Sequence, residues 1–275
     1  MMKNLLRADI YRVMKSKLTL VALILALAFP VLIVLLYAGL GAIMDLDPEI
    51  AGTVTLFNAN SIIGSAYSMT NNLGLVVPAF AGILVCLDYT NGTLRNKIIA
   101  GNRRTAVYMS HLTVSVLFSV VIITIYAAVT AGLALIFFPF DGADSPDLWK
   151  EILFFVLNGT MGFVFIATVS TFLAMVTRSV APTLIFTIVI ALVLLAVNTV
   201  LALADYHSFR YAAYLIPNFT ANFFNLNSMS ALGIMGQAAE ESRGLMFAEG
   251  MLSYLFFGAV NTAAGIVIFN KRDIK

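Results

Sequence analysis

Residues 18–40 read LTLVALILALAFPVLIVLLYAGL, an apolar run without a charged side chain. A run of about 20 such residues is long enough to cross the hydrocarbon core of a bilayer as a helix. A cleaved secretory signal is the other structure that such a segment near an N-terminus forms. The apolar region of a secretory signal is shorter, about 7–15 residues, and is followed by a small-residue cleavage pattern. No such pattern follows this segment. The segment therefore predicts a transmembrane helix.

Five further apolar runs follow, at 64–87, 107–138, 152–176, 180–204 and 250–270. The second run is the weakest, because its first half contains Ser65, Ser68, Thr70, Asn71 and Asn72. The chain of 275 residues is 61% hydrophobic and 11% charged, whereas a soluble domain is about 25% charged. Backbone groups in lipid must be paired internally, and barrel strands would alternate over about 10 residues, which these runs do not. We expect one all-α integral membrane domain over 1–275 with six transmembrane helices.

The charges between these runs orient the helices. Six spans place both termini on one side of the membrane, together with residues 88–106. That side holds 13 of the 16 Lys and Arg residues but only 3 of the 14 acidic residues. Because basic loops face the cytoplasm, we expect both termini and residues 88–106 in the cytoplasm. The net charge of +2 is too small to suggest binding to nucleic acid.

The first 17 residues form a separate element. One helical face collects the apolar residues Met2, Leu5, Leu6, Ile10, Val13 and Met14. Most of the basic residues lie elsewhere around the helix. A basic amphipathic helix of this kind lies in the membrane interface, and the alternative is a frayed start to the first span.

The predicted spans contain no Asp, Glu, Lys or Arg. Charged groups inside membranes usually belong to proton relays and ion paths, so their absence disfavours a proton-coupled pump. His111 is the one ionisable group near the spans, and we expect a hydrogen-bonded interface residue there. Cys86, the single cysteine, is expected to be a small buried side chain that forms no disulfide or metal cluster.

Catalytic and nucleotide-binding motifs are missing. The chain has no paired His and Glu at metalloprotease spacing, no G-x-S-x-G and no G-x-x-x-x-G-K-[ST]. A phosphate-binding loop needs the last of these patterns. The acidic group Asp45, Asp47 and Glu49 is expected to be a solvated outer loop. We expect a protein that is not an enzyme, holds no cofactor or metal, and depends on another polypeptide for energy.

Residues 88–104, DYTNGTLRNKIIAGNRR, interrupt the apolar sequence with a polar, basic stretch. Asn91-Gly92 predicts a turn, Thr93 is a candidate helix cap and Gly101 is a typical residue after a helix end. The short helix predicted over 94–100 has an apolar stripe of Leu94, Ile98 and Ile99, flanked by Arg95 and Lys97. On these grounds alone, a knob that enters a groove on a partner and an ordinary basic loop are equally good interpretations.

This stretch resembles the loop after the second span of ABC-2 type transporter permeases. Asp88 matches the acidic residue of the family pattern, Gly92 and Thr93 its Gly-Thr pair, and Arg103-Arg104 the arginine before the third span. The family often has glutamate where Asp88 stands and a proline near Asn102. The amphipathic N-terminus and the ending FNKRDIK at 269–275 extend the resemblance to the layout of the whole chain.

The resemblance implies a permease subunit whose helix at 94–100 is a coupling helix, seated in a separate ATPase subunit that binds ATP and Mg²⁺. The implied ATPase-binding residues are Asp88, Gly92, Thr93, Leu94, Arg95, Lys97, Ile98, Ile99, Arg103 and Arg104. Two permease chains, identical or different, would pair around a path lined mainly by the first, second and fifth spans. The candidate path residues are Asn71, Asn72, Asn198 and Thr199, for which helix packing is the other interpretation.

The resemblance also implies export across the inner membrane of a bacterium and re-entrant helices at the outer face, within 205–249. A path without fixed charge suits an amphipathic or hydrophobic cargo, such as an antimicrobial peptide, a drug or a lipid. The main alternative is a self-sufficient secondary transporter or channel, which predicts an internal repeat and coupling groups at mid-membrane. A membrane-embedded component of an importer and a membrane enzyme are the remaining alternatives.

Overall fold

The computed structural model describes residues 2–44, 59–67, 72–140, 148–203 and 243–272, and the regular structure of these residues is helical throughout. The helices are α1 (Met2–Met14), α2 (Lys17–Met44), α4 (Ala59–Ala66), α5 (Asn72–Thr90), α6 (Thr93–Ile99), α7 (Arg104–Phe137), α8 (Leu148–Thr177), α9 (Val180–Leu203) and α12 (Arg243–Lys271).

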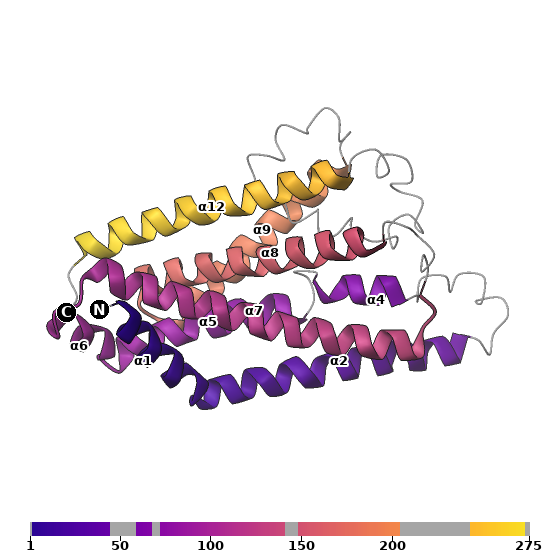
Figure 1. The fold of residues 1–275 in the computed structure, drawn as a ribbon, viewed down its shortest axis with the longest axis horizontal. Coiled ribbons are helices and arrows are strands. Elements are labelled where there is room, and N and C mark those ends of the chain that lie inside the picture. The colour runs from indigo at the N-terminus through magenta and orange to yellow at the C-terminus, as the bar shows by residue number, and fades with distance from the viewer. Residues whose placement is uncertain (1, 45–58, 68–71, 141–147, 204–242, 273–275) are drawn as a thin grey trace.

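The long helices run side by side along the long axis of an elongated bundle (Figure 1). Helix α8 packs against α5, α7, α9 and α12, and it is the most buried of the candidate membrane spans. In the most apolar stretch of α8, 67% of the residues are buried, whereas in the most apolar stretch of α2 only 22% are buried. Helices α1 and α6 and the last turn of α12 gather at one end of the bundle, which we call the terminal end (Figure 1).

Within the part of the chain that the structure describes, four helices are long and apolar enough to cross a membrane: α2, α7, α8 and α12. They coincide with the predicted runs at 18–40, 107–138, 152–176 and 250–270. Helix α7 has 34 residues, which at 1.5 Å per residue makes it roughly 50 Å long. Because the hydrocarbon core is about 30 Å thick, α7 is long enough to project beyond it. The chain is thus a helical integral membrane protein.

Of the other two predicted spans, the one at 64–87 differs from expectation. Residues 64–87 do not form one helix: α4 ends at Ala66, Tyr67 lies in a turn, and α5 begins at Asn72. The described interruption is at Tyr67, and residues 68–71 lie outside the described residues. Helix α9 (Val180–Leu203) is continuous and covers nearly all of the predicted run 180–204.

The predicted re-entrant region 205–249 lies mostly outside the described residues. Its last part does not belong to such a region, because α12 already begins at Arg243 and continues without interruption to Lys271. The acidic loop around Asp45 and the ending after Arg272 also lie outside the described residues.

Helix α1 packs along α7. Its inward face carries Leu5, Asp9 and Val13, which are buried and follow each other at four-residue spacing. Met14, which the sequence assigned to the apolar face, is 72% exposed. The face that packs on the bundle therefore includes Leu5, Leu6, Ile10 and Val13 of the apolar stripe read from the sequence, but it also buries Asp9 and leaves Met14 outside.

Tyr108 of α7 packs directly onto the backbone of α12 at Gly265. A Cβ atom at Gly265 would lie 2.1 Å from the Tyr108 hydroxyl and 2.5 Å from its Cζ. The Tyr108 ring is fully buried, so it has no free space to move into. We expect Gly265→Ala to lower the free energy of unfolding by about 1–3 kcal/mol, the usual cost of overpacking, measured by SDS titration in mixed micelles.

Gly258 of the same helix is the matched control, because a Cβ there would have no neighbour within 4 Å. Gly258→Ala is expected to change the free energy of unfolding by no more than about 1 kcal/mol, in the stabilising direction, since alanine is the better helix former. Equal effects of the two substitutions would contradict the contact between Tyr108 and Gly265.

Candidate functional site

The turn before α6 depends on Gly92. This residue is the N-cap of α6 and has φ +66°, a left-handed conformation that glycine adopts without strain. The predicted cap Thr93 is instead the first residue of the helix. Its hydroxyl donates to the backbone carbonyl of Asp88 (3.2 Å), so it fixes the turn to the end of α5. The prediction that Thr93 caps the helix is wrong, because the turn closes one residue earlier.

The end of α6 is closed by Gly101 and Asn102. Gly101 has φ +85°, and its N–H donates to the carbonyl of Ile98 (2.9 Å). The Asn102 side chain donates to the carbonyl of Lys97 (2.8 Å). Left-handed residues directly after a helix commonly satisfy its last carbonyls in this way. Asn102, which stands near the family's frequent proline, thus has a capping role in this chain.

The faces of α6 differ from the predicted stripe. Leu94 is fully buried beneath the helix, among Leu5, Tyr108 and Phe269. Ile98 is partly buried against the same group, whereas Ile99 is 72% exposed. Arg95 and Asn96 are exposed. Thus α6 uses Leu94 and Ile98 to attach to the bundle, and it presents Ile99 and Arg95 outward.

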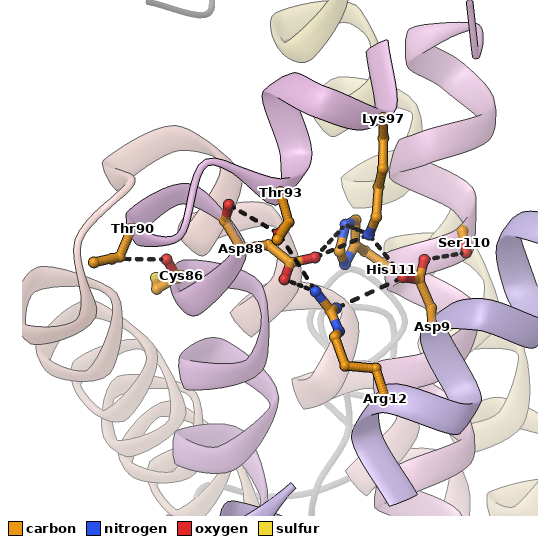
Figure 2. Close-up of polar contacts among 9 residues, drawn as sticks. All are labelled: Asp9, Arg12, Cys86, Asp88, Thr90, Thr93, Lys97, Ser110 and His111. Carbon is orange, nitrogen blue, oxygen red and sulfur yellow. Dashed lines mark hydrogen bonds and ion pairs between the residues drawn. The ribbon is translucent and has the colours of Figure 1, made fainter. Parts of the chain in front are cut away.

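Lys97 points inward from α6, into a group of polar side chains that we call the polar cluster (Figure 2). The cluster consists of Asp9 and Arg12 on α1, Asp88 on α5, Thr93 and Lys97 on α6, and Ser110 and His111 on α7. Lys97 Nζ donates to Asp9 Oδ1 (2.7 Å) and Asp88 Oδ2 (2.9 Å), and it lies 3.2 Å from His111 Nε2. One ammonium group therefore joins α6 to three other helices.

The two carboxylates of the cluster have further partners. Asp88 forms an ion pair with Arg12, and its Oδ2 lies 3.2 Å from His111 Nε2. Ser110 Oγ donates to Asp9 Oδ2 (2.7 Å), and Arg12 Nη2 lies 3.6 Å from Asp9 Oδ1. The side chains of Asp9 and Asp88 are only 3% and 2% exposed. Two buried carboxylates thus face two cations, Arg12 and Lys97.

The surroundings shift the acid–base properties of the cluster. Burial alone would raise the pKa of the Asp9 carboxyl, but nearby positive charge and the hydrogen bonds from Lys97 and Ser110 outweigh it and hold that pKa below its usual range. Burial lowers the pKa of the Lys97 ammonium, and the hydrogen bond to Asp9 opposes this shift. Each group thus depends on the other, as buried charges generally depend on a partner.

Asp9, Arg12 and Ser110 are members of this site that were not predicted from the sequence. The available signal was the position of Asp9 between Leu5 and Val13, at four-residue spacing on what becomes the buried face of α1. His111 was expected to be hydrogen-bonded at an interface, and it is buried beside Lys97 and Asp88. Cys86 is buried, as predicted, and lies 3.4 Å from the Thr183 hydroxyl.

The two arginines before the third predicted span have different positions. Arg103 is exposed and is the N-cap residue of α7, without a side-chain cap. Arg104 Nη1 donates to the carbonyls of Asn270 (3.0 Å) and Arg272 (2.8 Å) at the end of α12. Cations at a helix C-terminus satisfy its free carbonyls and its negative dipole end, so Arg104 fastens α12 to α7.

The predicted path residues fall where the structure describes no side chains. Asn71 lies outside the described residues, and the side chains of Asn72, Asn198 and Thr199 are not described either. Among the residues that the structure describes, no group of three or more His, Cys, Asp and Glu side chains is placed to hold a metal ion. The candidate functional site is therefore α6 with the polar cluster behind it.

One known protein family matches the part of the chain that contains this whole site. The family model described as ABC-2 family transporter protein matches residues 5–194. The match begins in α1 and ends in α9, so it contains each member of the polar cluster. A search among curated proteins finds no match.

Proposed function

The chain belongs to the ABC-2 transporter family, and from this premise we propose that α6 is the coupling helix that binds a separate ATPase subunit. In this proposal the permease provides the path for the substrate, while the partner binds ATP with Mg²⁺ and supplies the energy. Helix α1, α6 and both termini face the cytoplasm, in agreement with the excess of basic residues on that side.

The observation that carries this proposal is the division of α6 into two faces. Leu94, Ile98 and Lys97 hold the helix against the bundle, whereas Ile99 is 72% exposed at the terminal end. Seven residues are too few for a helix that is stable by itself in water or on a lipid surface. A short, firmly held helix with an exposed isoleucine and an exposed arginine suits a groove on a protein.

Two permease chains, identical or different, enclose the path in this proposal, and α1 follows the membrane interface. The cargo is an amphipathic or hydrophobic compound, because the predicted spans that line the path carry no charged side chain. Export is the direction that the family resemblance favours. The alternative, a self-sufficient secondary transporter or channel, has coupling groups at mid-membrane, whereas the ion pairs between the described residues lie in the polar cluster at the terminal end.

Transport by reconstituted protein tests the proposal. The chain is inserted into liposomes with and without the ATPase that copurifies with it, and three fluorescent probes are compared: an amphipathic antimicrobial peptide, a hydrophobic drug-like dye and a phospholipid. We expect movement of at least one probe that requires both ATP and the ATPase. Movement by the chain alone, driven by an ion gradient, would contradict the proposal and support the secondary transporter.

A further inference from the structure

The polar cluster connects α6 to α1 as well as to its neighbours in sequence. We propose that α1 is an arm that transmits displacement of α6 to the start of α2, and that Asp9 and Lys97 form the joint between the arm and α6. This inference rests on the proposed function, because α6 must meet a partner before it transmits any displacement. Asp9 and Lys97 are positioning residues in this account.

The joint is a buried ion pair with several supports. Lys97 Nζ lies 2.7 Å from Asp9 Oδ1, and the Lys97 side chain is only 15% exposed. Lysine is rarely buried unless it is paired. Ser110 of α7 donates to the second oxygen of Asp9, so the carboxylate is held in one orientation between α6 and α7. Figure 2 shows Lys97 reaching from α6 toward this carboxylate.

The other end of the arm is fixed at the junction with α2. Only Lys15 and Ser16 separate α1 from α2. The Thr19 N–H donates to Ser16 Oγ (3.1 Å), and the Ser16 N–H donates to the Val13 carbonyl (3.0 Å). The Thr19 hydroxyl also donates to the Val13 carbonyl. These bonds join the last turn of α1 to the first turn of α2, so movement of α1 is passed on to α2.

The consequence is a second route from α6 into the membrane. Helices α5 and α7 flank α6 in sequence and receive its movement through the chain itself. Helix α2 ends at Met44, well before α6 begins at Thr93. The joint is a direct polar link from α6 to the arm that leads into α2, and it is shorter than the hydrogen bond from Arg12 of the arm to Thr93 Oγ1 (3.4 Å). The link between α6 and α1 requires both charges. If one of them is removed, the other is left buried without a partner, which strongly destabilises this arrangement.

Hydrogen–deuterium exchange of the full chain in nanodiscs of phosphatidylcholine and phosphatidylglycerol tests the joint. We expect Asp9→Asn to accelerate exchange of the α6 amides at least about tenfold, although residue 9 lies far from α6 in sequence. Lys97→Met is expected to accelerate exchange of the α1 amides by a similar factor. The double variant is expected to exchange no faster than the worse single variant, because both substitutions break one interaction.

Lys15→Met is the control, because this exposed cation directly after α1 lies outside the polar cluster, and it is expected to leave exchange in α6 unchanged. If Asp9→Asn does not fold, Ser110→Ala is measured in the same way, since it removes only the bond that orients Asp9. Unchanged exchange of α6 in a folded Asp9 or Ser110 variant would overturn the joint.

The arm itself is tested with the ATPase that copurifies with the chain. In the unmodified complex, ATP is expected to change exchange around residues 13–19, and Asp9→Asn is expected to abolish that change while the ATPase stays bound. An ATP-dependent change at 13–19 that survives Asp9→Asn would overturn the arm. An unmodified chain that binds no ATPase would overturn the proposed function instead, and exchange in the isolated chain would still decide the joint.

Discussion

Ile99→Glu is expected to remove the ATPase from the purified complex while the permease remains folded in the membrane. Ile99 is 72% exposed on α6, so the substitution leaves the packing of the chain intact. In a groove of the partner, the new carboxylate would lose water without gaining a partner. We expect a loss of at least about 2 kcal/mol, or roughly 30-fold in Kd, measured by titration of the purified ATPase.

Met14→Glu is the matched control, because Met14 is also 72% exposed but lies on α1. This variant is expected to keep the affinity for the ATPase. The sequence alone suggests Ile98→Glu for the same test, but Ile98 is partly buried against the bundle, so a charge there would disturb the fold as well as the docking. Unchanged affinity of the Ile99→Glu variant would contradict the coupling-helix assignment.

Among the substitutions considered for their effect on stability, Asp88→Asn is expected to cause the largest loss. Asp88 is paired with Arg12 and Lys97 and its side chain is 2% exposed. Its neutralisation leaves two cations, the partly exposed Arg12 and the mostly buried Lys97, facing the one remaining carboxylate. Removing one partner from a buried ion-pair network costs about 3–5 kcal/mol, and we expect a decrease of that size in the free energy of unfolding, measured by SDS titration.

A compensating variant tests whether charge balance is the cause of this loss. The double variant Asp88→Asn with Arg12→Gln restores the charge balance, because one carboxylate (Asp9) then faces one cation (Lys97). We expect this double variant to be more stable than Asp88→Asn alone. Arg95→Met, which removes an exposed cation from α6, is expected to change stability by no more than about 0.5 kcal/mol. A loss below about 1 kcal/mol in Asp88→Asn would show that the polar cluster does not stabilise the terminal end.

Much of the helical layout could be predicted from the sequence, because length and hydropathy decide whether a segment is a long apolar helix. This reasoning located α2, α7, α8 and α12. It failed at 64–87, where an average over the run concealed the break between α4 and α5. It also missed the start of α12 at Arg243, since Glu249 and Arg243 resemble loop residues although the helix continues through them.

The position of α6 could be predicted from local signals, but its orientation could not. Gly92 and Gly101 bound the helix because the chain needs left-handed residues there. Which face turns inward depends on residues of other helices, above all Asp9 and His111, which receive Lys97. A lysine read from sequence is expected to be solvated, and only the tertiary contacts with Asp9 and Asp88 make an inward position stable.

The most direct measurement is a pull-down of the tagged native chain in mild detergent, followed by mass spectrometry of the bound proteins. We predict an ATPase with a phosphate-binding loop, recovered in amounts comparable to those of the permease. Recovery of the chain without any such ATPase, together with solute movement in liposomes that needs no ATP, would contradict the account.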